Sequence, residues 1–313
     1  MDLLSDVLRV VRLNGAYFYT VEAGAPWSVS ATAARDLAPR ILPECEHLVS
    51  YHIITSGSCW GGLAGEPQLR LEAGDAILFP QGDPHVLSSD EGRRLPGDTL
   101  GTTPQRYPET VRLGPGRPDV TLVCGFLGCD ARPFNPLLAA LPRCLRVRGV
   151  TGDWLSEFPR QVVAESRLGR VGADTMLTRM AELMFIEVLR RHLETLDDGQ
   201  SGWLAGLRDP VVGPALSCLH AKPSHPWTLD DLAREVGASR TVLAERFPRV
   251  VGLPPMQYLT RWRMQTAADL LARSGAKVAA VAADVGYESE AAFSRAFKRE
   301  TGQSPAGFRA TRQ

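Results

Sequence analysis

Apolar residues follow one spacing in the first half of this chain of 313 residues and a different spacing after residue 154. The first half contains short runs rich in β-branched and aromatic residues, separated by Gly, Pro and Asp. Runs of this kind are typical of strands in a β-sandwich or barrel. The Gly- and Pro-rich stretch 90–118 predicts a long surface loop. The predicted strands cover residues 48–55, 68–71, 76–79 and 120–127.

A helical period begins after residue 154. Apolar residues between 176 and 193 recur at the spacing that places them on one broad helical stripe. The stripe must be buried, either against the chain's own domains or against a second copy of the chain, and we favour the dimer interface. The polar stretch 197–202 then predicts a linker. The stripe consists of Met176, Leu177, Met180, Leu183, Met184, Ile186, Val188, Leu189 and Leu193.

The C-terminal region contains an internal repeat. Residues 227–237 resemble residues 277–286, and Gly237 aligns with Gly286, 49 positions later. Two copies of one short pattern predict two copies of one structural unit. A polar residue and two apolar residues also align, after one additional residue in the second copy: Ser239, Leu243 and Phe247 with Ser289, Phe293 and Phe297.

The first half of each copy has the pattern of a short helix that ends in a tight turn. Thr228 is suited to cap the first of these helices, with Asp231 at the capping-box position. Gly237 permits the left-handed backbone that a tight turn needs. One apolar helical face is formed by Leu229, Leu232, Ala233 and Val236.

The second half of each copy predicts a second helix, so each copy is a helix-turn-helix unit. Ser239 and Ser289 are suited to cap these helices. Pro248 is expected to end the first of them early. The residues expected to face inward are Val242, Leu243 and Phe247 in the first copy and Ala292, Phe293 and Phe297 in the second.

A single helix is predicted between the two copies, because residues 254–275 begin with Pro and end with Gly. About 19 residues at ~1.5 Å each give a length of roughly 28 Å. This is close to the ~34 Å of one turn of DNA. A helix of this length is suited to hold two recognition helices in successive major grooves.

Composition and charge are those of an ordinary soluble globular protein with one basic part. Hydrophobic residues make up 44% and charged residues 22%, and the net charge of zero hides a basic C-terminal part. Residues 210–313 contain 14 Lys and Arg against 9 Asp and Glu, which favours a polyanionic partner. The chain begins without the pattern of a signal peptide, and no apolar run suits a membrane span, so we expect a cytoplasmic protein. The six cysteines are then reduced thiols, metal ligands or redox sensors rather than a disulfide framework.

Residues 283–309, from Ala-Asp-Val-Gly-Tyr-Glu-Ser to Ser-Pro-Ala-Gly-Phe-Arg, carry the signature of a known family. The stretch closely resembles that of the AraC/XylS transcription regulators, and the resemblance covers roughly residues 210–313. It implies binding to double-stranded promoter DNA. The residues expected to touch DNA lie early and outward on the two recognition helices: Ser239, Arg240, Thr241, Ala244, Glu290, Ala291, Ser294, Arg295 and Lys298.

Roles follow from the side-chain chemistry of these residues. Arg240 and Arg295 are the best base readers, because a guanidinium pairs bidentately with guanine O6 and N7. Lys298 and Arg299 are better suited to contact phosphates. The alternative for each of these charged side chains is that it is a solvated surface group that does not contact DNA.

Residues 74–85 have the spacing of the second cupin motif, G-x5-P-x-G-x2-H, which ends at His85. The first cupin motif would need His-x-His, and the sequence offers His47 and His52 instead. This departure disfavours an oxygenase site. The N-terminal part of the chain, about residues 1–205, resembles the cupin-type sensor domain of one branch of AraC-family regulators. That branch includes the reactive-chlorine sensor RclR. Further matching features are Ser58-Cys59-Trp60, Cys124-Gly125 and the run 133–138, Pro-Phe-Asn-Pro-Leu-Leu.

Two histidines and two cysteines of this half form a candidate zinc site: His52, His85, Cys124 and Cys129. Cys124 and Cys129 are five positions apart and lie on opposite faces of a regular strand, unless Gly125 and Gly128 introduce a bulge. Three alternatives stay open. The thiols and imidazoles are core residues, the thiols are oxidised by the signal, or the barrel holds a small organic ligand.

These observations predict an α+β protein in three parts. Residues 1–150 form a cupin-like β-barrel sensor, residues 151–205 a helical linker or dimerisation region, and residues 206–313 an all-α domain with two helix-turn-helix units. The expected function is sequence-specific transcription regulation by a homodimer whose sensor responds to a metal, an oxidant or a small molecule. No enzyme activity is expected. The alternatives are a metal-dependent cupin oxygenase fused to a DNA-binding domain and a metal-free thiol redox switch.

Overall fold

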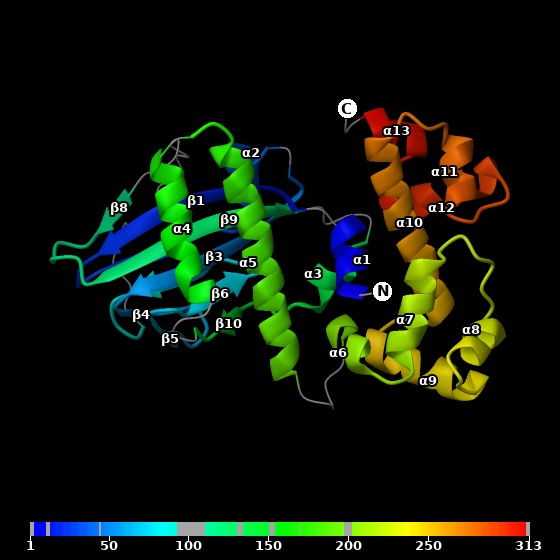
Figure 1. Ribbon diagram of the computed structural model, residues 1–313, viewed down its shortest axis with the longest axis horizontal. Helices are drawn as coiled ribbons and strands as arrows, with labels where there is room; N and C mark the ends of the chain where they lie inside the picture. The colour runs from blue at the N-terminus through cyan, green and yellow to red at the C-terminus, as the bar shows by residue number, and fades with distance from the viewer. Residues whose placement is uncertain are drawn as a thin grey trace. The chain divides into compact units, whose positions relative to one another are not determined.

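Two compact units are interleaved along the chain (Figure 1). A computed structural model describes residues 3–10, 13–43, 45–92, 110–129, 134–149, 154–168, 170–196 and 202–310. One unit spans Leu13–Asp130 and Leu141–Thr195 and is named the sensor unit after the role that the sequence predicts for it. The other, called the DNA unit, combines Leu196–Gln313 with Met1–Arg12 and Ala131–Ala140. The predicted architecture of a β-rich N-terminal part and a helical C-terminal part is confirmed, but short segments from the N-terminal half lie in the DNA unit.

The sensor unit is built from two facing sheets. The large sheet has the strand order β10-β6-β3-β9-β1-β8, and the small sheet has the order β2-β7-β4-β5. Within the described residues the two sheets are not joined into one closed barrel. The strands are β1 (Leu13–Ala23), β2 (Ser28–Ala31), β3 (His47–Ser56), β4 (Ser58–Leu63), β5 (Leu69–Glu72), β6 (Ala76–Phe79), β7 (His85–Ser88), β8 (Thr110–Leu113), β9 (Val120–Cys129) and β10 (Leu145–Val147).

The prediction of one long loop over residues 90–118 is only partly correct. Residues 93–109 lie outside the described part of the chain, but residues 110–113 form β8, which pairs in parallel with β1. This strand alternates exposed and half-buried positions at the edge of the sheet. A partner 90 positions earlier supplies its hydrogen bonds, and sequence spacing gives no signal for such a pairing.

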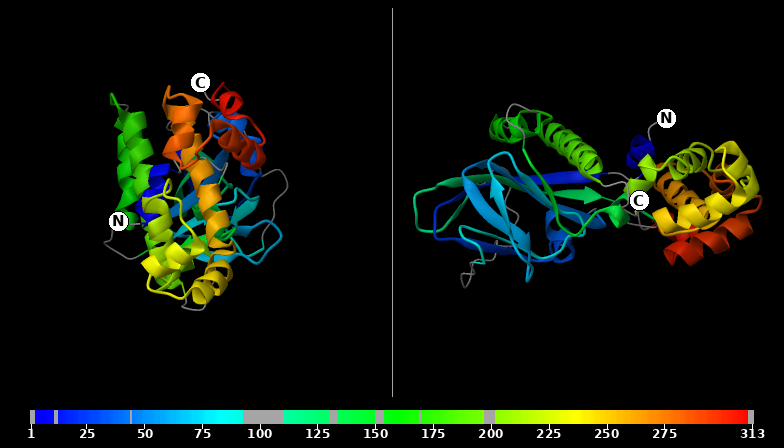
Figure 2. Two further views of the ribbon diagram at one scale, coloured as in Figure 1. Left: turned by 90° about the vertical axis from the view of Figure 1, so that its right-hand side faces the viewer. Right: turned by 90° about the horizontal axis from the view of Figure 1, so that it is seen from below.

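Strand alternation divides the long strand β9 between two layers. Leu122 and Cys124 face the interior between the two sheets and belong to its apolar core. Leu127 and Cys129 occupy the opposite face of the large sheet, and both are buried. Helices α4 (Trp154–Leu168) and α5 (Ala173–Thr195) cover that second face (Figure 2). A further helix, α2 (Ala34–Ile41), packs against β3.

The apolar stripe predicted from the sequence lies on helix α5, where some of its residues are buried and others are exposed. Its buried members Leu177, Met184, Val188 and Leu189 pack within the sensor unit. Met176 and Leu183, in contrast, are 53% and 55% exposed. The stripe therefore buries four of its nine residues in its own domain and leaves Met176 and Leu183 as an exposed apolar surface.

The DNA unit is helical. The short helices α1 and α3, which come from the N-terminal half of the chain, pack against its helices α7 and α6. Nowhere in the described part of the chain is there a helix long and apolar enough to cross a membrane. The helices are α1 (Leu3–Val10), α3 (Pro136–Ala140), α6 (Trp203–Arg208), α7 (Val212–Ala221), α8 (Leu229–Glu235), α9 (Arg240–Val251), α10 (Pro255–Arg273), α11 (Val278–Asp284), α12 (Glu290–Thr301) and α13 (Pro305–Ala310).

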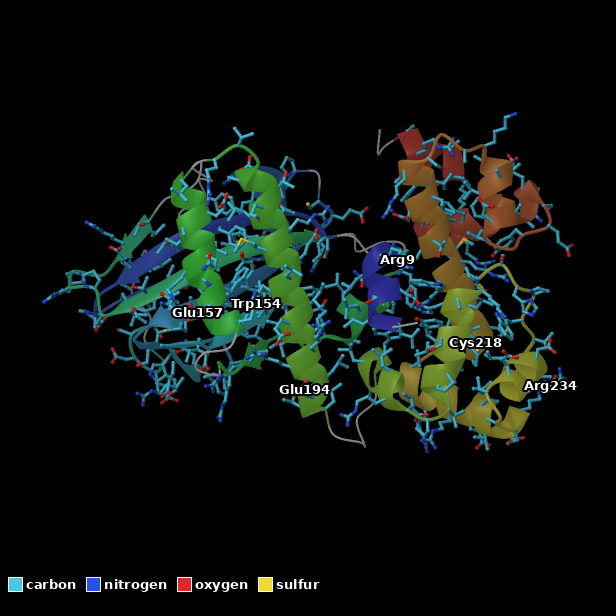
Figure 3. All side chains as sticks on the ribbon, in the orientation of Figure 1. Arg9, Trp154, Glu157, Glu194, Cys218 and Arg234 are labelled. Carbon is cyan, nitrogen blue, oxygen red and sulfur yellow. The ribbon has the colours of Figure 1, made fainter. Side chains whose placement is uncertain are left out.

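Both predicted helix-turn-helix units are confirmed. The Thr228 hydroxyl accepts a hydrogen bond from the Asp231 backbone N–H at 3.1 Å and so caps α8. Asp231 also pairs with Arg234, which is labelled in Figure 3. Gly237 and Gly286 have φ values of 67° and 82° in the two turns. At Gly286 a Cβ would lie 2.5 Å from the Ser224 carbonyl oxygen, so both backbone angle and space require glycine there.

The prediction that Pro248 ends the first recognition helix is wrong. Helix α9 continues to Val251, and Gly252 in the left-handed conformation ends it. Proline keeps a φ value that suits a helix, so its main cost is one missing backbone donor. The Pro248 carbonyl still accepts a hydrogen bond from the Gly252 N–H at 2.9 Å. The two recognition helices, α9 and α12, thus have the same length of 12 residues.

Candidate DNA-binding surface and sensor interior

The recognition helices are positioned by equivalent serine caps. The Ser239 hydroxyl accepts the Val242 N–H, and the Ser289 hydroxyl accepts the Ala292 N–H, both at 3.2 Å. On the inner side Leu243 and Phe247 of α9 and Phe293 and Phe297 of α12 are fully buried. Since the buried side of each helix is fixed in this way, the opposite side is left to face a ligand.

None of the predicted DNA contacts is buried. Most are exposed, and Ala244 and Ser294 are half-buried. The exposed ones are Ser239, Arg240, Thr241, Glu290, Ala291, Arg295 and Lys298. Accessibility is the condition for a contact with DNA, and every one of these positions meets it.

The two candidate base readers differ in their surroundings. The Arg240 guanidinium pairs with Asp230 of α8 at 3.0 Å. In the described structure no carboxylate pairs with Arg295 or Lys298. An exposed ion pair such as that of Arg240 contributes little stability. Asp230 therefore orients Arg240 weakly, while Arg295 is available without breaking an ion pair.

Val242 is a candidate contact that the sequence analysis misplaced. We expected it to face the core, but its side chain is 44% exposed on the first turns of α9. It is adjacent to Thr241, which is also exposed. An apolar side chain at this place is suited to contact the methyl group of thymine. Leu243 and Phe247, one and five positions later, are both buried. A residue at these two spacings does not share their side of a helix, so the helical period already indicated that Val242 lies away from the inner face.

The interior of the sensor unit holds one row of polar side chains across the large sheet. Tyr19 of β1, Cys124 of β9 and His52 of β3 lie opposite one another in register. The Tyr19 hydroxyl hydrogen-bonds the Cys124 thiol. Opposite them on β7 of the small sheet lies His85, whose Nε2 is 2.8 Å from Nε2 of His52. Three of the four predicted ligands thus face the interior, and of these the two histidines are in direct contact.

Hydrogen bonding sets the tautomers of this histidine pair. His85 Nδ1 lies 2.9 Å from the Asp83 carbonyl oxygen, which only accepts, so Nδ1 carries a proton. In neutral His85 the Nε2 atom is then an acceptor, and His52 Nε2–H donates to it. His52 Nδ1 is consequently unprotonated. It is buried, and it has no hydrogen-bond partner among the residues that the structure describes.

Burial keeps both rings neutral. It lowers the pKa of His85 from 6.5 to about 4, against a smaller opposing effect of Asp83. It lowers the pKa of His52 well below 6.5, and the nearby His85 lowers it further. The stacking of His85 on Phe79, with ring centres 3.8 Å apart, adds to the apolar surroundings. The pair is therefore a neutral hydrogen-bonded unit at physiological pH.

Cys129 does not join this group. The pairing of β3 with β9 runs without a bulge from Cys129 to Leu122, so the strand keeps its alternation, and Cys129 lies on the face opposite Cys124. Across the described part of the chain, no group of three His, Cys, Asp or Glu side chains is arranged to hold a metal ion. The four residues of the predicted zinc site therefore do not come together in the described structure.

The interior thiols are also poor nucleophiles. Burial raises the pKa of Cys59 to about 12 and raises that of Cys124 well above 9.0. Oxidants react with thiolate rather than thiol. Because so little thiolate is present near neutral pH, this conformation disfavours direct oxidation of either cysteine.

Comparison with known proteins agrees with both halves of the molecule. A cupin family model matches residues 2–194, and a helix-turn-helix domain model matches residues 232–311. A putative AraC-like transcription regulator of Streptomyces lividans is 35% identical over 99% of this chain and 98% of its own length. The chain belongs to the AraC-like transcription regulators that carry an N-terminal cupin domain.

Two further relatives of this AraC-like regulator also align over the full length. The HTH-type transcriptional regulator AlkR of Acinetobacter baylyi is 31% identical over 99% of each chain. The RCS-specific HTH-type transcriptional activator RclR of Escherichia coli is 26% identical over 99% of this chain and 97% of its own length. The family resemblance expected from the sequence is thereby confirmed.

Acidification tests the neutral histidine pair of this AraC-like regulator. Unfolded His85 binds protons below pH 6.5, whereas folded His85 does so only near pH 4. Stability is therefore present at neutral pH and is lost as the pH falls from about 6.5 towards 4. We expect His85 to contribute a loss on the order of 1–2 kcal/mol in the free energy of unfolding between pH 7 and pH 5, measured with urea.

The matched protein for this measurement is His85→Gln, which lacks the titrating ring. His220 of the DNA unit, whose pKa burial lowers to about 3, remains in both proteins and cancels in the comparison. The variant should show a smaller loss of stability on acidification. The same loss in both proteins would contradict a neutral, buried His85.

Proposed function

We propose that this AraC-like regulator reads a specific operator with α9 and α12 and that a small organic molecule bound in the sensor unit controls that reading. The observation that carries the first part is the matched presentation of two capped recognition helices with exposed basic side chains. Helix α10 joins them, and its 19 residues span roughly 28 Å. This length favours binding in two successive major grooves on one side of the DNA.

The second part is supported by the unpartnered acceptor at His52 Nδ1. A buried acceptor without a donor costs free energy, and a ligand with an O–H or N–H group would satisfy it. The other two effector classes have less support. The described residues lack a metal-binding group, and the raised pKa values of Cys59 and Cys124 disfavour oxidation.

The position of His47 disfavours the alternative of a cupin oxygenase, which would need His47 beside His52 and His85. His47 and His52 are five positions apart on β3 and therefore point to opposite faces. His47 Nε2 donates instead to the Pro80 carbonyl at 2.6 Å. Among the described residues, no third His, Cys, Asp or Glu side chain joins His52 and His85 in a metal-binding group, which disfavours the ligand set of a cupin oxygenase. The proposed function is non-enzymatic control of transcription in the cytoplasm.

The DNA-reading part is tested by a matched pair of variants on α12. Arg295→Ala should cost about 1–3 kcal/mol of affinity for the operator and relax the preference at one guanine. Lys298→Ala should weaken binding to all sequences alike and reduce the slope of log affinity against log salt by about 1. Fluorescence anisotropy with operator and scrambled duplexes separates the two effects. Unchanged affinity and preference in Arg295→Ala would remove that residue from the reading surface.

The effector proposal is tested with pairs of small molecules that differ by one donor. Phenol is compared with anisole and indole with 1-methylindole, because methylation removes the O–H or N–H and nearly preserves shape. We expect a donor to raise the melting temperature of the intact protein and its methylated counterpart to do so less. His52→Phe should abolish the difference. Equal shifts within each pair, or no shift with any donor, would contradict hydrogen bonding to His52.

We also propose a homodimer formed through the exposed stripe of α5. Met176 and Leu183 lie seven positions apart on one helical face, and both are more than half exposed. Trp154 of α4, labelled in Figure 3, adds an aromatic side chain that is 47% exposed. Two protomers would double a DNA interface that is small in one chain.

Leu183→Glu places a charge in this apolar surface and should convert the dimer to a monomer in light scattering, with the melting temperature little changed. Thr175→Glu is the control, because it adds the same charge at an exposed polar position of the same helix. A wild-type monomer, or a dimer that survives Leu183→Glu, would overturn this interface.

A further inference from the structure

Residues 134–138 lie between β9 and β10 of the sensor unit in sequence but are part of the DNA unit in space. Asn135 begins the segment's short helix, since its side-chain oxygen accepts the Leu138 N–H at 2.9 Å and so caps α3. Pro136 occupies the first position of that helix, where proline is favoured. Leu137 and Leu138 are buried, and α3 packs against α6. The segment is therefore a built part of the DNA unit and not a loop that passes over it.

Phe134 attaches the segment to α10 by three different contacts. Its backbone N–H donates to Gln265 Oε1 at 2.9 Å. Its ring meets the Tyr258 ring edge-on at 5.5 Å, and the Arg261 guanidinium lies 5.9 Å from its centre. Tyr258, Arg261 and Gln265 are spaced by three and four positions, so they form one face of α10.

Gln265 shows that α10 depends on this segment. Its side chain is only 2% exposed. Without the Phe134 N–H, the Gln265 oxygen would lose this donor in a buried place, which costs free energy. A buried polar group on the helix that joins the two helix-turn-helix units is thus satisfied by a residue that the sensor half of the sequence supplies.

The same α10 residues contact both recognition helices. The Tyr258 ring meets the Phe247 ring of α9 edge-on at 5.8 Å. The Arg261 Nε atom lies 3.9 Å from Glu300 of α12. Phe134 is therefore one contact away from each recognition helix. Packed side chains of this kind have few alternative arrangements, so a shift of Phe134 changes how the two helices are held.

We propose that residues 134–138 act as a wedge that sets the relative position of the two recognition helices. The proposal rests on the function proposed above. The effect of the wedge appears as a preference for one spacing of the two DNA half-sites.

The experiment uses the intact chain and a duplex selected from a random library by the wild-type protein. Binding is measured on this duplex and on versions with one or two base pairs inserted between the half-sites. Phe134→Ala should weaken binding to the selected duplex by about threefold to tenfold, the size expected for lost ring contacts. It should also reduce the penalty of the insertions, because the two helices are then held less firmly.

Gln265→Met gives a second route to the same result, since it removes the acceptor from the DNA unit and leaves the wedge sequence intact. The double variant should be no worse than the more affected single variant, because both changes release one segment. Ala139→Ser, at an exposed position of α3, is the matched control and should behave as wild type.

The outcomes separate the wedge from the proposed function. If the wild-type chain selects no sequence, operator reading itself fails. If it selects one and both Phe134→Ala and Gln265→Met keep wild-type affinity and wild-type insertion penalties, the wedge is overturned. Circular dichroism reports whether Phe134→Ala folds, and if it does not, Gln265→Met decides alone. Additive losses in the double variant would also contradict a single shared segment.

Discussion

The burial of helix α10 is the constraint on which the DNA unit depends. Tyr258 is fully buried at its first half, where the Trp203 indole N–H and His220 Nε2 both lie 2.8 Å from its hydroxyl oxygen. The second half of the helix contributes Met264, Ala267 and Leu271 to the core of the second helix-turn-helix unit. One helix therefore supplies part of both cores, which is why the proposed wedge against α10 would act on both recognition helices.

The sensor unit depends on a different principle, which is the enforced neutrality of buried polar groups. Its interior places two imidazoles and a hydrogen-bonded tyrosine–thiol pair among apolar side chains. Burial favours the uncharged form of every one of these groups. The interior thus presents hydrogen-bond donors and acceptors from uncharged side chains, which is the chemistry on which the proposed binding of a small organic molecule rests.

Local features of the fold were predictable from the sequence, and the errors have local reasons. The serine and threonine caps, the turn glycines and the bounds of α10 follow from interactions within a few residues, and the structure confirms them. The error at Pro248 came from treating proline as a helix end when a glycine four positions later was the stronger signal. Val242 was misplaced because the inner face of α9 is narrower than a pattern of three apolar residues suggests.

The residues of the candidate sites also fall into two groups, those that local helical periodicity predicts and those that depend on strand pairing. The recognition-helix residues were predictable because a helix period alone decides which side chains point away from Leu243 and Phe247. His52, His85 and Cys124 were identified by type, but their meeting depends on the pairing of strands that are distant in sequence. The same pairing excludes Cys129, since a strand without a bulge keeps strict alternation.

By itself the sequence determined the family, the two helix-turn-helix units and the residues they present, because periodicity, caps and turns act over short distances. Only the tertiary structure decided which interior groups meet, which tautomer each histidine adopts and where residues 134–138 belong. Those features depend on contacts between residues 33 to 131 positions apart. Sequence spacing carries no information about such contacts, because they are decided by how whole layers pack and which buried polar groups find partners.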